Sequence, residues 1–287
     1  MSKKILIFTL TLCIASFSFA EVAQFLKIVP VAKPAAMGEA YVGAANDLYG
    51  LYYNPASVGK LQAKQLVATY NSLFEGMSYM YAAYGQTLQS GGAIAAQLGY
   101  LSYGSVDKYV NGTKQGSISP TSMFVSAAYG MEMKSNPGLF VGGAVKMIQE
   151  TLDSSAQGFA LDAGVLYTLQ GQPAVIGASI SNLGSGLKFK NETGSLPMII
   201  RAGVGYKYGE QINIAADISS SAGTTGVHVG FEYLMQQFVI RAGYSTLSGI
   251  SAGAGIALGE QYTLDLAYVQ GSADLGSIIK VSLLLKL

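Results

Sequence analysis

The sequence has little charge and few of the side chains that catalysis and metal binding use most. Only 11% of its 287 residues are charged, compared with roughly 25% in an ordinary soluble domain. It contains one histidine, His228, one cysteine, Cys13, and no tryptophan. The 17 basic and 16 acidic residues nearly cancel, so the basic surface that nucleic-acid binding requires is missing. We therefore expect no enzyme, no cofactor, no metal site and no nucleic-acid partner.

The first twenty residues have the pattern of a secretory signal peptide. Lys3 and Lys4 precede an apolar stretch over 5–15, and Ser18-Phe19-Ala20 is a small-x-small cleavage site. The stretch is too short to span a bilayer as a helix. We predict cleavage before Glu21, which removes Cys13 and leaves no cysteine for a disulfide, a thiolate nucleophile or a zinc-thiolate site.

The remaining sequence alternates apolar and polar residues with the period of a β-strand. In 159–167, for example, apolar residues lie on one face and Asp162 lies on the other. No run after residue 20 approaches the roughly 18 apolar residues of a membrane helix. About fourteen such segments follow Lys64, with boundaries uncertain by roughly two to four residues. Their predicted spans are 64–71, 76–86, 92–103, 120–131, 138–149, 156–168, 174–183, 197–208, 211–219, 225–234, 237–246, 249–258, 261–269 and 276–287.

The connections between these segments also form a pattern. Those that follow segments 2, 6, 8, 10 and 12 are short, such as Gly209-Glu210 and Gly259-Glu260, whereas those after segments 3, 5, 7, 9 and 13 are mostly longer. The connection after segment 11 is short and breaks this rule. Short turns at one end and longer loops at the other are typical of outer-membrane barrels. We therefore predict an all-β fold, a transmembrane antiparallel β-barrel of about fourteen strands over 64–287. The protein should lie in the bacterial outer membrane, with its apolar face against the lipid bilayer.

Charged residues within the predicted strands should point into the barrel, because the outer face meets lipid. The five basic and four acidic residues nearly balance, which indicates pairing in the lumen rather than selection of one ion sign. These residues are Lys146, Asp162, Arg201, Lys207, Asp217, Glu232, Arg241, Asp265 and Lys280. Four of them are carboxylates that could in principle form a catalytic acid pair, but the interleaved cations favour charge neutralisation.

Residues 21–63 lack strand periodicity and form a third unit, which we predict to be a hatch inside the barrel. Small residues over 35–45 indicate a short helix, and 46–56 indicate a turn that leads to the first strand. The order Met37-Gly38, Asp47 and Asn54-Pro55-Ala56 resembles the N-terminus of the PorV/PorQ family, which is related to FadL-type long-chain fatty acid transporters. This chain has Ser57 where the family usually has glycine, and Tyr53 where it commonly has tryptophan. Without the family, Asn-Pro would simply be a common turn dipeptide.

The resemblance implies a fourteen-stranded barrel with an N-terminal hatch. It also implies passage of small hydrophobic or amphiphilic molecules, without covalent chemistry, when the hatch at Met37, Gly38, Asp47 and Asn54-Pro55-Ala56 shifts. FadL-type proteins open sideways at a kink in the third strand, where this chain has Gly99.

Two alternatives remain. One is a PorV-like accessory barrel of a type IX protein secretion system, with secretion components as partners; the other is a sealed structural barrel. A docking barrel should have long outer loops. The longest predicted loop here, 104–119, is short for that role, which favours transport.

Overall fold

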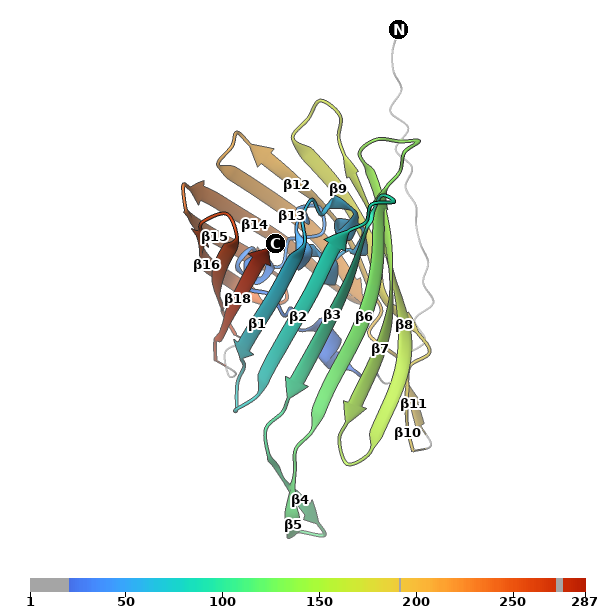
Figure 1. Cartoon of the computed structure of the whole chain (residues 1–287). Coiled ribbons are helices and arrows are strands. Elements are labelled where there is room, and N and C mark those ends of the chain that lie inside the picture. Colours follow the sequence, from blue (N-terminus) through green and yellow to red (C-terminus); the bar gives the residue numbers. More distant parts are fainter. Residues whose placement is uncertain (1–20, 191, 272–275) are drawn as a thin grey trace.

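The computed structural model describes residues 21–190, 192–271 and 276–287. Within these ranges, 14 strands close into one antiparallel barrel (Figure 1). Every predicted strand is present, and every boundary lies within two residues of its predicted position. The barrel strands are β1 (Gln65–Ser72), β2 (Ser78–Thr87), β3 (Ala93–Ser102), β6 (Thr121–Glu132), β7 (Leu139–Thr151), β8 (Ser155–Thr168), β9 (Ala174–Gly184), β12 (Ile199–Tyr208), β13 (Ile212–Ser221), β14 (Thr224–Met235), β15 (Phe238–Ser245), β16 (Gly249–Leu258), β17 (Tyr262–Val269) and β18 (Ile278–Lys286).

Each barrel strand pairs with its sequence neighbours in the barrel, and the first and last strands close the ring. Gln65 of β1 lies opposite Lys286 of β18, and Ser72 lies opposite Ile279. Closure leaves no strand edge unpaired, as a protein surrounded by hydrocarbon requires. Within the described ranges, no helix is long and apolar enough to cross a membrane.

Burial alternates along the strands and separates an apolar outer face from a polar inner face. On β7, Val145 is 59% exposed and its neighbour Lys146 is 7% exposed. Large apolar side chains are exposed on the outside of every barrel strand, including Phe159 of β8 and Leu266 of β17. The scarcity of charge in the sequence therefore reflects the area of wall that faces lipid.

The connections at the two ends of the barrel differ in length, although less than the sequence indicated. We name the end with connections 88–92, 133–138, 169–173, 209–211, 236–237 and 259–261 the turn end, and the opposite end the loop end. The prediction of longer loops at the loop end is wrong for 152–154 and 222–223, which are as short as turns, whereas 246–248 is short as expected. Ala222 and Gly223 both have positive φ, which suits the tight two-residue hairpin turn.

Two loops at the loop end contain short hairpins that the alternation pattern did not predict. One hairpin, β4 (Val106–Val110) and β5 (Thr113–Ile118), projects beyond the barrel (Figure 1). The other, β10 (Leu187–Phe189) and β11 (Glu192–Gly194), belongs to the connection between β9 and β12.

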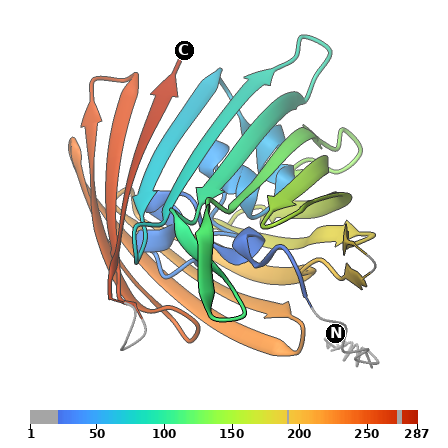
Figure 2. The same ribbon diagram turned by 90° about the horizontal axis from the view of Figure 1, so that it is seen from below.

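Residues 21–63, here called the N-terminal segment, lie inside the barrel (Figure 2). The segment contains η1 (Gln24–Lys27), α1 (Ala32–Ala36), η2 (Leu48–Tyr52) and η3 (Pro55–Lys60). The predicted helix over 35–45 is wrong, because α1 ends at Ala36 and both Gly38 and Glu39 have positive φ. The small residues there allow an irregular backbone to approach the wall rather than extend a helix.

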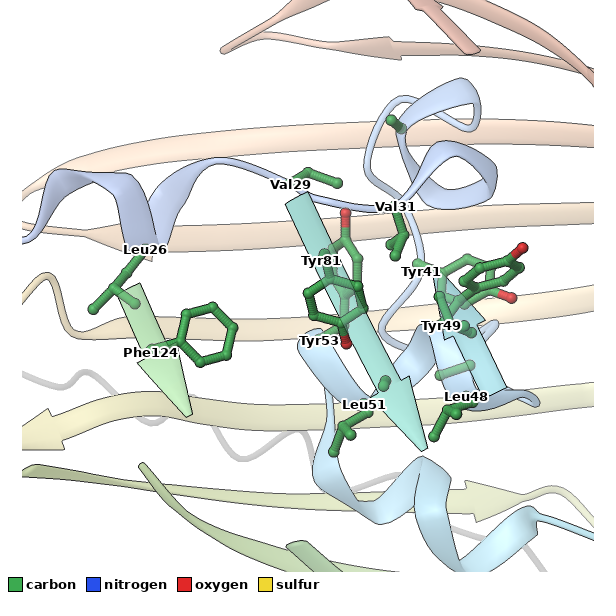
Figure 3. Packing of buried hydrophobic residues seen from close by; sticks show 14 of the residues in the cluster. Leu26, Val29, Val31, Tyr41, Leu48, Tyr49, Leu51, Tyr53, Tyr81 and Phe124 are labelled. Carbon is green, nitrogen blue, oxygen red and sulfur yellow. The ribbon is translucent and has the colours of Figure 1, made fainter. Parts of the chain in front are cut away.

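The hydrophobic core lies in the lumen, between the segment and the wall. Figure 3 shows Leu26, Tyr41 and Tyr49 of the segment in one cluster with Tyr81 of β2 and Phe124 of β6. A barrel of this size has room for a packed interior, and here the chain's own N-terminal segment supplies about half of the buried apolar residues.

Candidate functional site

Wall side chains hold the N-terminal segment chiefly by hydrogen bonds to its peptide groups. An irregular segment has few internal partners for its N–H and C=O groups, so the wall must supply them. These contacts join Ala23 to Glu150, Val29 to Lys280, Pro30 to Asn71, Ala32 to Ser282, Gly38 to Ser251 and His228, Tyr41 and Val42 to Asp217, Leu48 to Gln65, and Tyr53 to Ser179.

The Asn54-Pro55-Ala56 motif joins the segment to strands β8 and β9. The Oδ1 atom of Asn54 accepts from the Ala56 N–H at 3.0 Å and so caps η3. Its Nδ2 donates to the carbonyl oxygens of Val165 at 2.9 Å and Ala178 at 3.3 Å. Asn54 is fully buried. The common Asn-Pro turn is therefore present, and its side chain also bonds the wall.

Glycines on the inner wall allow the motif to approach the barrel backbone closely. A Cβ atom on Gly142 of β7 would lie 2.5 Å from the Ala56 nitrogen, and one on Gly164 of β8 would overlap the Asn54 amide. Such distances are shorter than any van der Waals contact, so a larger residue would displace the segment. This close approach explains part of the chain's high glycine content.

Met37-Gly38 lies against strands β14, β15 and β16. Gly38 has a φ of 62°, and a Cβ atom there would lie 2.6 Å from the Val229 carbonyl oxygen. Its N–H donates to Ser251 Oγ at 3.0 Å. Its carbonyl lies 3.1 Å from Nδ1 of His228, whose Nε2 contacts Ser219 Oγ at 2.8 Å. The single histidine is therefore hydrogen-bonded through both ring nitrogens.

Asp47 organises the segment from within. Its carboxylate caps η2 by accepting from the Tyr49 N–H at 3.1 Å, and it also accepts from the Tyr41 hydroxyl. Lys33 Nζ lies 3.1 Å from Asp47 and 3.9 Å from Glu232 of β14. Burial by itself would lower the pKa of Lys33, but these two carboxylates raise it well above its usual range. Lys33 therefore stays charged and links the segment to the wall.

Three of the predicted wall charges pair with one another. Arg241 of β15 lies between two carboxylates, with Nε 2.6 Å from Glu232 and Nη1 2.7 Å from Asp265 of β17. The Tyr49 hydroxyl of the segment donates to Asp265 at 2.9 Å. The two carboxylates each bond a cation, so the neutralisation favoured by the sequence describes them better than a catalytic acid pair.

Lys146 and Asp162 form a second group on β7 and β8. Lys146 Nζ lies 2.9 Å from Asp162 and 2.7 Å from the Asn182 side-chain oxygen. The Asn182 N–H donates to Asp162 at 2.7 Å. This group lies where β8 and β9 shift register, with Asn182 at a φ of 62°, which is a β-bulge.

Two more of the predicted charges, Asp217 and Arg201, contact the segment. The Oδ2 atom of Asp217 accepts from the N–H groups of Tyr41 at 2.6 Å and Val42 at 2.7 Å. The Arg201 guanidinium lies over the rings of Tyr52 and Tyr53, at 5.8 and 5.4 Å from their centroids. Sequence reasoning placed both side chains in the lumen but did not identify these partners, because they are distant in the sequence.

The wall is continuous at Gly99. Strand β3 pairs with β2 and β6 without a register shift, and Gly99 makes room for Phe124 and Tyr79 on the inner face. The described barrel has its register irregularity at β8–β9 instead. A lateral opening at Gly99 stays a prediction.

Two cavities lie between the segment and the wall at the turn end. The smaller, here called the segment cavity, has a volume of about 260 Å³ and is lined by Met37, Tyr41, Ala44, Asn46 and other residues of the segment and of β8–β14. The larger, here called the mouth cavity, has a volume of about 630 Å³ and includes Gln62, Gln236 and Lys286. Both share Lys33, Asn46, Lys60 and Glu232. Sequence reasoning identified none of the cavity residues Asn46, Lys60 and Gln62, since no periodic pattern marks them.

Among the residues that the structure describes, no group of three or more histidine, cysteine or acidic residues is arranged to bind a metal ion. The polar groups of the lumen instead bind one another and the segment. This arrangement can hold the segment against the wall and position a small ligand.

No protein-family model and no curated protein matches the sequence. Solved structures do resemble it. The Pseudomonas putida toluene transporter TodX aligns over 94% of this chain and 98% of its own, with a TM-score of 0.62 at 15% identity. CymD, a monoaromatic hydrocarbon channel, aligns over 90% and 98%, with a TM-score of 0.67 at 12% identity. A Pseudomonas aeruginosa FadL homologue aligns over 90% and 99%, with a TM-score of 0.62 at 11% identity. At these identities the comparisons show one shared property, the fold of the barrel.

Proposed function

We propose that this protein is exported through a cleaved signal peptide to a bacterial outer membrane, where it passes small hydrophobic or amphiphilic molecules. The turn end faces the periplasm and the loop end faces the outside, as in outer-membrane barrels with short periplasmic turns. The N-terminal segment is a hatch that shifts to let a molecule pass. The residue order that resembles the PorV/PorQ family lies in this segment.

One observation carries the proposal: a lipid-facing barrel contains a segment of its own chain that leaves cavities against the wall. A sealed structural barrel has no need of the segment cavity or of the wider mouth cavity. The likeness in fold to TodX and CymD, which are named for toluene and monoaromatic hydrocarbons, supports hydrophobic cargo.

The path runs along the barrel axis, past the segment. A sideways exit at Gly99 would have to separate β3 from a neighbour, which breaks a regular ladder of backbone hydrogen bonds in hydrocarbon. The axial path requires only that side-chain contacts to the segment be released, such as those of Asn54 and Asp217.

Uptake of toluene into vesicles with a lipopolysaccharide outer leaflet tests the proposal. Vesicles that contain the protein should take up toluene faster than empty ones. Replacement Asn54→Ala should raise the rate further, because it removes two contacts that hold the segment to β8 and β9. The matched control is Asn136→Ala, an exposed residue of the turn 133–138. Equal uptake with and without protein would refute transport and leave the fold unaffected.

A second candidate is an accessory barrel of a type IX secretion system, like PorV. The hairpin β4–β5 favours it, since it projects beyond the barrel and its Tyr109 side chain is 61% exposed. Co-purification of a secreted domain with the wild type, and its loss when 106–118 is replaced by a short turn, would support this role. Unchanged toluene uptake by the same variant would separate it from transport.

A further inference from the structure

The charges around the segment cavity do not balance. Three lysines, Lys33, Lys60 and Lys207, line it together with one carboxylate, that of Glu232. The other lining residues on the segment side include Met37, Tyr41 and Ala44, which offer mainly carbon atoms. The cavity therefore combines an apolar wall with an excess of positive charge.

The carboxylate and one lysine are already engaged. Glu232 bonds Arg241 at 2.6 Å and Asn213 at 2.8 Å, and Lys33 lies 3.1 Å from Asp47. A ligand that enters the cavity therefore meets Lys33 and Glu232 already paired with opposite charges. These two side chains offer the ligand little net charge.

Lys60 and Lys207, in contrast, are not engaged in an ion pair of this kind within the described part of the chain. Neither has a carboxylate within 4.0 Å among residues 21–190, 192–271 and 276–287. Lys60 Nζ has only the ring of Phe140, whose centroid is 5.7 Å away. Burial lowers the pKa of Lys60, which is the direction expected for a cation without an anion beside it. Both ammonium groups thus have donors available to an anion at the cavity.

We infer that the segment cavity binds small carboxylates with one apolar ring or short chain, and that Lys60 and Lys207 select the anion. The inference rests on the proposed function and specifies the amphiphilic class of its cargo. The apolar part lies against Met37, Tyr41 and Ala44, and the carboxylate meets the two lysines. The volume of about 260 Å³ is just below the roughly 300–1,000 Å³ of pockets for drug-sized ligands, so the cargo is smaller than those.

A neutral hydrocarbon fits this cavity less well. It would fill the apolar side but displace water from two ammonium groups without replacing their hydrogen bonds, which is unfavourable for a charged group. A carboxylate replaces those bonds with charge-assisted ones. The cavity should therefore prefer benzoate to benzyl alcohol, which has the same ring and no charge.

Binding can be measured without transport. Because the chain has no tryptophan, the variant Gln172→Trp places a single indole reporter at a residue that lines the cavity. In detergent at pH 7, its fluorescence should respond to benzoate saturably. Benzyl alcohol should bind at least about tenfold more weakly.

Charge removal identifies the selecting residues. In the reporter background, Lys60→Gln and Lys207→Gln should each weaken benzoate binding by about tenfold and leave benzyl alcohol unchanged. Lys134→Gln removes a charge from an exposed turn residue at the same end and should change neither. The heat-dependent shift in gel mobility confirms that each variant is folded.

The outcomes separate the inference from the proposed function. Equal binding of benzoate and benzyl alcohol, or a preference that survives both lysine replacements, would overturn the inference even if vesicles take up toluene. Selective benzoate binding that depends on the lysines would support the inference, even if vesicle uptake is absent and the transport proposal fails.

Discussion

Replacing Gly142 by alanine should loosen the N-terminal segment while the barrel stays closed. The added Cβ would lie 2.5 Å from the Ala56 nitrogen and closer still to Pro55. These are backbone atoms, so the segment itself must move. Overpacking of this kind costs about 1–3 kcal/mol, which corresponds to a roughly 5- to 150-fold increase in the open population of the segment. The neighbouring Gly143 provides the control, because a Cβ there points outward, 3.7 Å from the nearest atom, the Asp162 carbonyl oxygen.

Hydrogen exchange measured by mass spectrometry on the peptide that contains residues 54–60 reports this opening directly. Its protection should fall by the stated factor in Gly142→Ala and stay at the wild-type level in Gly143→Ala. The strands β6 to β8 should keep their protection in both variants. If the two alanine variants lose protection equally, or neither does, then close packing of the motif against β7 does not hold the segment in place.

Three further changes test other contacts. Asp217→Ala leaves two buried N–H groups of the segment without their acceptor and should destabilise its docking by about 2–6 kcal/mol, seen as faster exchange at residues 41–43 but not in β16. Arg241→Met leaves Asp265 without its cation and Glu232 with only Lys33, 3.9 Å away, and should lower unfolding stability in detergent by about 3–5 kcal/mol; an unchanged denaturant midpoint would refute the role of these ion pairs. Val145→Arg puts a charge on the lipid face of β7 and should cost about 2–4 kcal/mol in bilayer unfolding titrations, whereas Ser117→Arg in the projecting hairpin should be neutral.

The strands could be predicted because their signal is local. Each one alternates apolar and polar residues, and this period alone decides which residues face lipid. The hairpins β4–β5 and β10–β11 gave no such signal. The strands β4 and β5 are exposed on both faces, and β10 and β11 have only three residues each. Short turns such as Ala222-Gly223 were missed for a related reason: a two-residue turn depends on backbone conformation, and alanine is not a typical residue for positive φ.

For the segment, the sequence predicted the position inside the barrel but not the local structure. Its position inside the barrel followed from its lack of periodicity and from the family resemblance, but its helix was placed wrongly. The residues 35–45 are small because they lie against glycines and polar side chains of β12 to β16, and not because they form a helix. Small residues are compatible with both arrangements, so composition could not distinguish them.

The sequence by itself determined the barrel, its strand boundaries and the inward direction of its charges, since lipid imposes a period of two on every strand. Only the tertiary structure decided what those charges do. Asn54 meets Val165, which is 111 residues away, and Asp217 meets Tyr41, which is 176 residues away. Whether a buried charge pairs with another charge, holds a peptide group or lines a cavity depends on such distant contacts, which closure of the ring creates and no local pattern records.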